Sequence, residues 1–247
     1  WTVNTISHNT AVVDERRQES NVAGRLVRLD ELGPVHVAEL AADGIYAVAN
    51  RYRRRLAVLE LPPGPSYILD VFDVAGGKQH DLSFHGPDGE CAFERVTLGP
   101  AAPGTLAGPE VPYAALYDDP VLGAPGYAGA YSGYRGSGFS HLEKPRRAAV
   151  SAPYTARWKL KGEPALNFAT HGLPEPGHEL IVADGRVSPS GKVPTVLTFL
   201  LQRARGEKLA STFVSVYEPY SGPPRIRSVS RLGTPAALGV LVEHGGF

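Results

Sequence analysis

The sequence predicts an all-β protein, an antiparallel β-sandwich of two stacked sheets that forms a single domain over residues 1–247. Three observations support this prediction. Glycine (28 residues) and proline (22 residues) are spread along the chain, as expected for many short strands joined by turns. A sustained helical periodicity is absent, and short apolar segments alternate with turn clusters. A chain of this length buries roughly 70–75% of its unfolded surface, so one large core needs no disulfides.

The first predicted strand covers residues 2–14, where threonine and valine dominate the sequence. Both residue types are β-branched and favour extended backbone. His8 lies in the middle of this strand, just before the apolar residues Ala11–Val13. A histidine on a rigid strand that enters the core is well placed to hold a ligand. The alternative is a buried histidine that hydrogen-bonds a neighbour for purely structural reasons.

Further strands are predicted in the first half wherever apolar segments lie between turn clusters: residues 35–39, 45–61, 67–74 and 80–85, of which 45–61 forms either one long strand or a hairpin. The best helical pattern, at residues 31–42, is interrupted by Gly33 and Pro34. We therefore expect these strands to form an antiparallel meander with one face packed on a second layer. Alternation in the strand at 80–85 places His80 and His85 on opposite faces. Each of the two histidines has a structural or a substrate-facing role.

Residues 99–153 differ in composition, being rich in glycine, proline, alanine and tyrosine. We interpret them as a long insertion over the surface, because long loops in compact domains are often functional. Tyr131 is a candidate for stacking on a sugar, since a tyrosine ring combines an apolar face with a polar tip. The alternative is a loop that packs on its own aromatic rings. Strands are predicted to resume at residues 154–160, 165–171, 178–183, 196–203, 210–218, 225–232 and 236–243.

Composition excludes several classes of protein. Lysine and arginine together number 25, as do aspartate and glutamate, so bulk charge does not favour binding to nucleic acid or to an anionic membrane. The single cysteine, Cys91, allows no disulfide within the chain. No apolar run approaches the roughly 20 residues of a membrane helix. The sequence contains no methionine, even at its start, so we interpret it as part of a longer protein whose export signal lies outside it.

A few polar residues are candidates for binding. Arg53 and Arg54 lie in an arginine-rich segment, and guanidinium groups bind carboxylates or sulfates through paired hydrogen bonds. The alternative is an exposed strand whose charges prevent edge pairing. His8 is the candidate metal ligand, although a zinc site needs three or four ligands. We identify no nucleophilic triad, phosphate loop or dinucleotide-binding motif, and we assign no catalytic residue.

Several stretches taken together resemble the heparinase II/III-like polysaccharide lyases, which include heparin, heparan sulfate and alginate lyases. Residues 7–14, Ser-His-Asn-Thr-Ala-Val-Val-Asp, are similar to the His-Asn-Thr-x-x-x-Asp signature of that family. Residues 53–56, 67–77 and 80–85 follow in the order of the family, as do residues 212–220 near the end. The resemblance covers residues 2–86 and 154–243.

The resemblance implies a lyase that pairs an N-terminal (α/α) toroid with a C-terminal antiparallel β-sandwich and cleaves acidic polysaccharide by β-elimination. Arg53, Arg54, Tyr131 and His85 remain our candidates for substrate binding, and the resemblance implies that His8 is one ligand of a divalent metal, most simply zinc. The catalytic tyrosine of the toroid and the His-x-His pair of the family are absent from this sequence. We therefore expect the β-sandwich portion of a periplasmic or secreted lyase, inactive by itself. The alternative is a non-catalytic carbohydrate-binding or structural β-sandwich.

Overall fold

The computed structural model describes residues 4–19, 21–61, 66–119, 121–126, 134, 136–163, 165–186, 196–234 and 237–245. Within these residues the chain is almost entirely β-structure, as the sequence predicts, and its helical turns are η1 (Thr5–Ser7) and η2 (Phe139–His141). All strand pairs are antiparallel. No helix among the described residues is long and apolar enough to cross a membrane.

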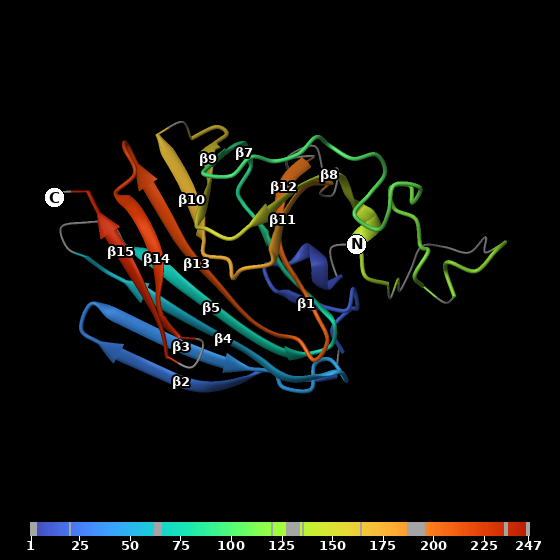
Figure 1. Ribbon diagram of the computed structural model, residues 1–247, viewed down its shortest axis with the longest axis horizontal. Helices are drawn as coiled ribbons and strands as arrows, with labels where there is room; N and C mark the ends of the chain where they lie inside the picture. Colours follow the sequence, from blue (N-terminus) through green and yellow to red (C-terminus); the bar gives the residue numbers. More distant parts are fainter. Residues whose placement is uncertain are drawn as a thin grey trace.

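Two large sheets form the sandwich (Figure 1). The five-stranded sheet has the order β1 (Ala11–Val13), β6 (Gln79–His85), β12 (Val196–Arg205), β11 (His178–Arg186), β8 (Leu142–Val150). The eight-stranded sheet has the order β2 (Arg25–Leu32), β3 (Val35–Ala41), β4 (Ala49–Leu59), β5 (Tyr67–Gly76), β13 (Ala210–Ser221), β10 (Leu166–Gly172), β9 (Tyr154–Leu160), β7 (Gly89–Glu94). A separate hairpin joins β14 (Ile226–Thr234) to β15 (Ala237–His244).

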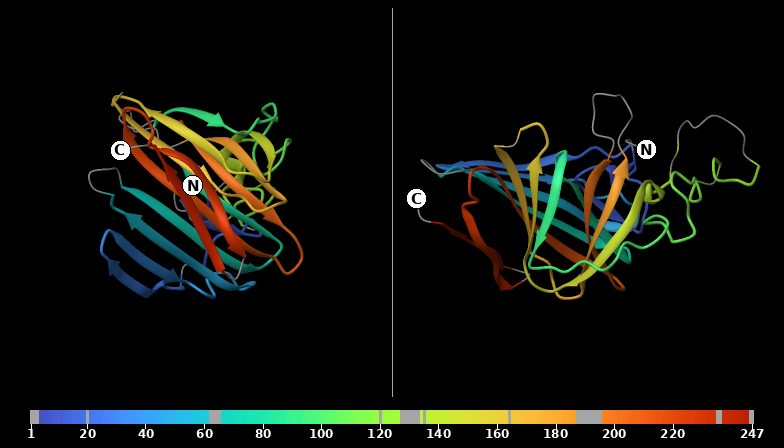
Figure 2. Two further views of the ribbon diagram at one scale, coloured as in Figure 1. Left: turned by 60° about the vertical axis from the view of Figure 1, so that its left-hand side comes forward. Right: turned by 90° about the horizontal axis from the view of Figure 1, so that it is seen from above.

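Alternation along the strands builds a core on both faces of the eight-stranded sheet. Phe213 of β13 points to the inner face, where it packs with Leu82 and Ala204 of the five-stranded sheet. The next residue, Val214, points to the outer face and packs against Ile226 of the hairpin. The right-hand view of Figure 2 places these C-terminal strands at one end of the molecule and the segment before η2 at the other.

The far face of the five-stranded sheet is covered by the two helical turns. Ile6 of η1 and Phe139 of η2 are fully buried there against Phe199 and Leu201 of β12. The predicted strand at residues 2–14 is therefore wrong in its first half, since it contains η1 and becomes a strand only at Ala11–Val13. The Ser7 hydroxyl donates to the Asn4 carbonyl at 2.7 Å, and such local bonds compete with a strand ladder.

The predicted meander is correct from β3 to β5 but wrong for β6, which belongs to the other sheet. Gly76 and Gly77 make this passage with φ angles of 102° and 79°, which side chains rarely adopt. As predicted, His80 and His85 lie on different faces of β6. His80 pairs in register with the inner-facing Ala204 of β12, and His85 pairs with the outer-facing Phe199.

The predicted insertion at residues 99–153 also needs correction, because its last part is the strand β8, paired with β11. Pro145 and three basic side chains conceal this strand in the sequence. Both are tolerated because β8 lies at the edge of its sheet. The strands β2 and β7, also at an edge, were likewise not predicted. The remaining strands agree with the predictions to within a few residues.

Candidate functional site

Asn9, in the loop between η1 and β1, joins three separate parts of the chain. Its side-chain Oδ1 accepts the backbone N–H of His85 at 2.8 Å, and its Nδ2 lies 3.5 Å from the His85 carbonyl oxygen. Its own carbonyl oxygen accepts Nη1 of Arg54 at 2.8 Å. We call His8, Asn9, Arg54 and His85 the Asn9 site. It unites three of the residues that the sequence singled out.

The Arg54 guanidinium is held rigidly on the inner face of the eight-stranded sheet. It donates Nε and Nη2 to the two oxygens of Asp70, at 2.9 and 2.7 Å. Asp70 is buried and also accepts the Tyr217 hydroxyl at 3.0 Å. Burial opposes the charge of Arg54, but the bonds to Asp70 raise its pKa on balance. Since Asn9 and Asp70 bind its three nitrogens, Arg54 positions the loop of His8.

His8 lies in the loop that Arg54 holds, and the backbone of His85 is bonded to Asn9 of the same loop. The His8 side chain is exposed, whereas the His85 ring is half-buried, with its centroid 5.2 Å from that of Phe199. Burial lowers the pKa of His85, and the neighbouring His8 lowers it further. His85 is therefore neutral at physiological pH, and a neutral imidazole can donate one hydrogen bond and accept another.

Arg53 lies on the opposite face of the sheet from Arg54, as strand alternation requires. Its Nη2 contacts Asp43 at 3.1 Å on the exposed outer surface. Arg55, on the same face, pairs with Asp73 at 2.9 Å. The structure thus separates Arg53 from the Asn9 site. Tyr131, the remaining predicted substrate residue, lies outside the described residues.

A zinc site is not formed by the described part of the chain. Its histidine, cysteine, aspartate and glutamate residues nowhere gather in a group of three or more that could hold a metal ion. A zinc ion takes three or four protein ligands. The residues described here therefore do not fit zinc by themselves, and we derive no chemical step through a metal.

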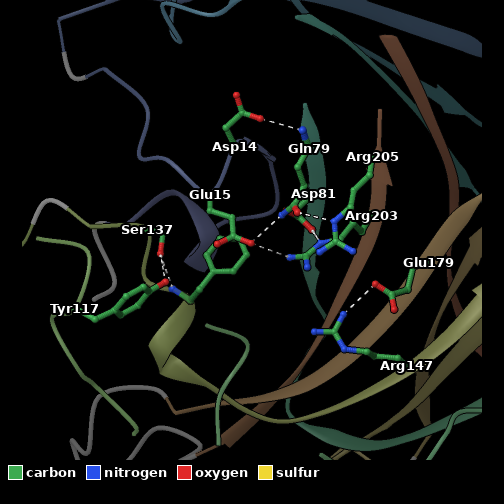
Figure 3. A network of polar contacts seen from close by, with 11 residues as sticks. Asp14, Glu15, Gln79, Asp81, Tyr117, Ser137, Arg147, Glu179, Arg203 and Arg205 are labelled. Carbon is green, nitrogen blue, oxygen red and sulfur yellow. Dashed lines mark hydrogen bonds and ion pairs between the residues drawn. The ribbon is translucent and has the colours of Figure 1, made fainter. Parts of the chain in front are cut away.

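A second polar cluster, which the sequence did not predict, lies on the outer face of the five-stranded sheet (Figure 3). The buried Arg203 donates Nε to Asp81 at 2.5 Å, and its Nη2 lies 3.7 Å from Glu15. Gln79 joins the two carboxylates, with its Nε2 at 2.7 Å from Asp81 and 3.0 Å from Glu15. Alternation in β6 predicts that Asp81 faces away from His80, but not that Arg203 meets it. The cluster ties β12 to β6 and to the loop of Glu15.

A third cluster is closed to large substrates. Nε2 of His171 lies 3.4 Å from one carboxylate oxygen of Glu218, and both side chains are buried. The other oxygen of Glu218 accepts the backbone N–H groups of Arg225 and Ile226, at 2.6 and 3.0 Å. Burial opposes the charge of Glu218, but the bonds from His171 and from these backbone groups lower its pKa on balance. Glu218 thus fixes the start of β14, and its burial leaves no room for a polymer.

No protein-family model and no curated protein matches the sequence. Among solved structures, a mutant of the heparan sulfate lyase HepC from Pedobacter heparinus has a TM-score of 0.56 and 11% identity, over 98% of this chain and 30% of that chain. A heparinase III gene product with methylated lysines has a TM-score of 0.54 and 13% identity, over 97% of this chain and 28% of that chain. A crystal structure of heparinase III has a TM-score of 0.52 and 12% identity, over 99% and 30%.

The chain therefore shares its fold with part of the heparan sulfate lyases and spans about 30% of the length of these proteins. At this level of identity, the likeness concerns the β-sandwich and not individual site residues. The class defined by the fold is an antiparallel β-sandwich domain of the kind present in these solved structures.

Proposed function

We propose that this chain is the β-sandwich portion of a lyase that cleaves uronic-acid-containing polysaccharide by β-elimination. In this proposal the parent is periplasmic or secreted, and its (α/α) toroid supplies the groups that transfer protons. The substrate lies in a cleft between the two parts. The fold similarity to heparan sulfate lyases supports a polysaccharide lyase as the parent protein.

The observation that carries the proposal is the convergence of residues distant in sequence on Asn9. His8 and His85 offer imidazole groups next to the Asn9 loop, which hydrogen bonds to Arg54 and to the His85 backbone hold in place. Neutral imidazole and guanidinium are suitable donors for the hydroxyl and carboxylate groups of a uronic acid. We assign substrate contact to His8 and His85, and a positioning role to Arg54. Arg53 would meet the polymer only on another surface.

The proposed zinc of the parent would take His8 as one ligand, with its other ligands from residues beyond those described. Neutral histidine suits zinc, and its exposed position leaves His8 accessible to ligands from elsewhere. A non-catalytic carbohydrate-binding sandwich is the second candidate function. It is favoured by the full engagement of Arg54 and by the lack of a metal-ligand group among the described residues.

The test is to measure the binding of heparan sulfate oligosaccharides to the chain by calorimetry or by NMR. His8→Ala and His85→Ala should each weaken binding about tenfold, because each removes a polar contact to the sugar. His36→Ala is the matched control, since His36 is exposed on β3 and its nearest ion-pair partner is Glu60 at 3.9 Å. Equal binding by all four proteins would remove the Asn9 site from the proposal.

An assay of polymer cleavage, with the chain and with a parent that includes the toroid, separates the two candidate functions. In the proposal, the chain alone releases no unsaturated uronate from the polymer, whereas a parent that includes the toroid does. Binding without release by such a parent would favour the carbohydrate-binding alternative.

A further inference from the structure

The strand β2 leaves an open edge on the eight-stranded sheet. It is the terminal strand of that sheet, and none of the described strands pairs with its outer side. Leu26, Leu29 and Leu32 of this strand are 58%, 67% and 59% exposed. Edge strands in proteins are normally protected, because their unpaired backbone groups can pair with another chain. The edge of β2 therefore combines exposed leucines and charged side chains with an open backbone that can pair with a partner.

Leu26 and Leu29 of β2 lie on the inner face of the sheet, whereas Leu32, opposite Val35, lies on the outer face. Leu26 lies opposite Leu40 of β3, and Leu40 lies opposite the inner-facing Arg54. Leu29 lies opposite Ala38 in the same way. Figure 1 shows β2 and β3 at the margin of the sheet away from the strands of the five-stranded sheet. We call Leu26, Leu29 and Leu40 the β2 strip.

Two charged residues of β2 flank Leu29 symmetrically. Arg28 lies on one side of it and Asp30 on the other, and both point to the outer face, opposite Glu39 and Val37. In the chain these two side chains contact each other. An antiparallel copy of the same strand, centred on Leu29, would place the Arg28 of each copy opposite the Asp30 of the other.

We propose that β2 pairs antiparallel with β2 of a second copy of this chain, about a two-fold axis at Leu29. Leu29 then faces Leu29 of the second copy on the inner face of the joined sheets. Arg28 and Asp30 form two ion pairs across the axis. A contact of this kind is self-complementary and closed, so it makes a dimer and not a fibre.

The sequence also fixes the register of this pairing. A shift to a centre at Arg28 or at Asp30 would bring two like charges together on the axis, which is unfavourable in cross-strand pairs. A shift by a single residue in the pairing would bring residues of opposite faces together. The irregularity between Leu26 and Arg28 confines the regular ladder to the second part of the strand. A short ladder buries less than a standard interface, so we expect a weak dimer.

Sedimentation equilibrium tests the proposal over roughly 10 µM to 1 mM protein, the range suited to a small interface. The chain should reach a dimer and go no further. Arg28→Asp should raise the dissociation constant about tenfold or more, because it creates two pairs of like charges. The double variant Arg28→Asp/Asp30→Arg should restore the dimer. Leu29→Lys should give a monomer, while Leu241→Lys, at an exposed position on β15, should behave as the unmodified chain.

A covalent test reports the register directly. Opposed residues in an antiparallel pair have Cα atoms about 4.5–5.5 Å apart, which suits a disulfide. Leu29→Cys should therefore form a disulfide-linked dimer on oxidation, whereas Leu241→Cys should not. The native Cys91 gives little background, since burial raises the pKa of its thiol to about 12.

Two outcomes would overturn the proposal. One is a chain that stays monomeric throughout the concentration range, which would leave the β2 strip to a different partner such as a further domain. The other is a dimer that Leu29→Lys does not weaken or that the charge-swapped double variant does not restore. Neither outcome bears on the Asn9 site, which is tested by oligosaccharide binding.

Discussion

At the scale of single residues, the Asn9 site depends on Asp70, although no sequence pattern drew attention to it. It is buried, and it neutralises Arg54, which in turn holds the carbonyl of Asn9. The loop of His8 therefore depends on a buried carboxylate that bonds to Arg54 and not to the loop itself. The acidic partner on the outer surface, Asp43, plays the corresponding part for Arg53, but in a more exposed setting.

These two ion pairs give a matched comparison. Asp70→Asn should lower the free energy of unfolding by about 2–4 kcal/mol, because it leaves the half-buried charge of Arg54 without its counterion. Asp43→Asn should cost less than about 1 kcal/mol, as is usual for exposed pairs. Urea unfolding of the two variants measures both values. Similar losses in the two variants would show that Arg54 is solvated well enough to stand alone.

At the scale of elements, the turn at Gly76 decides which strands belong to which sheet. The chain finishes β5 in the eight-stranded sheet and enters β6 in the five-stranded sheet at this position. A Cβ atom at Gly76 would lie 2.1 Å from the Val48 carbonyl oxygen, in addition to the strain of φ = 102°. The Gly76 carbonyl also accepts a hydrogen bond from the His80 ring at 2.6 Å.

Gly76→Ala should therefore destabilise the protein by about 3 kcal/mol or more, through a backbone clash added to conformational strain. Gly44→Ala is the control, since Gly44 also has a positive φ, 93°, but a Cβ atom there would meet no atom within 4 Å. It should cost only the strain, about 1–2 kcal/mol. Thermal or urea unfolding distinguishes the two; equal costs would mean that the contact with Val48 relaxes easily.

At the scale of the whole molecule, stability should depend on buried neutral histidines. Burial lowers the pKa values of His80, His85, His141 and His178, and those of His141 and His178 fall to about 4. Histidines in the unfolded chain take up protons near pH 6.5, before those in the folded chain do. The unfolded state therefore binds more protons in this window, and stability is lost as the pH falls from about 6.5 toward 4.

The free energy of unfolding should thus fall between about pH 7 and pH 5. His178→Gln should be less stable than the parent chain at neutral pH, because it loses packing on Phe213, but its stability should change less with pH. His36→Gln, at an exposed position, should keep the pH dependence of the unmodified chain. Urea unfolding at both pH values measures the slope. An unchanged slope in His178→Gln would place the acid sensitivity elsewhere.

The sequence by itself determined the β class and most strands, because alternation is a local property that one strand displays alone. It placed β9 at Tyr154–Leu160 and assigned His80 and His85 to opposite faces. The same rule, applied to Arg53 and Arg54, would have separated them as the structure does. Alternation did not predict edge strands such as β2 and β8, because exposure on both sides or a proline removes the alternating pattern.

Only the tertiary structure decided which residues meet. Asn9 lies 45 residues from Arg54 and 76 from His85, and their contacts depend on how the two sheets stack. Nor does local pattern specify that β5 and β6, adjacent in sequence, belong to different sheets. The physical reason is that hydrophobic alternation fixes the direction of each side chain, whereas its neighbours are chosen by the packing of whole sheets.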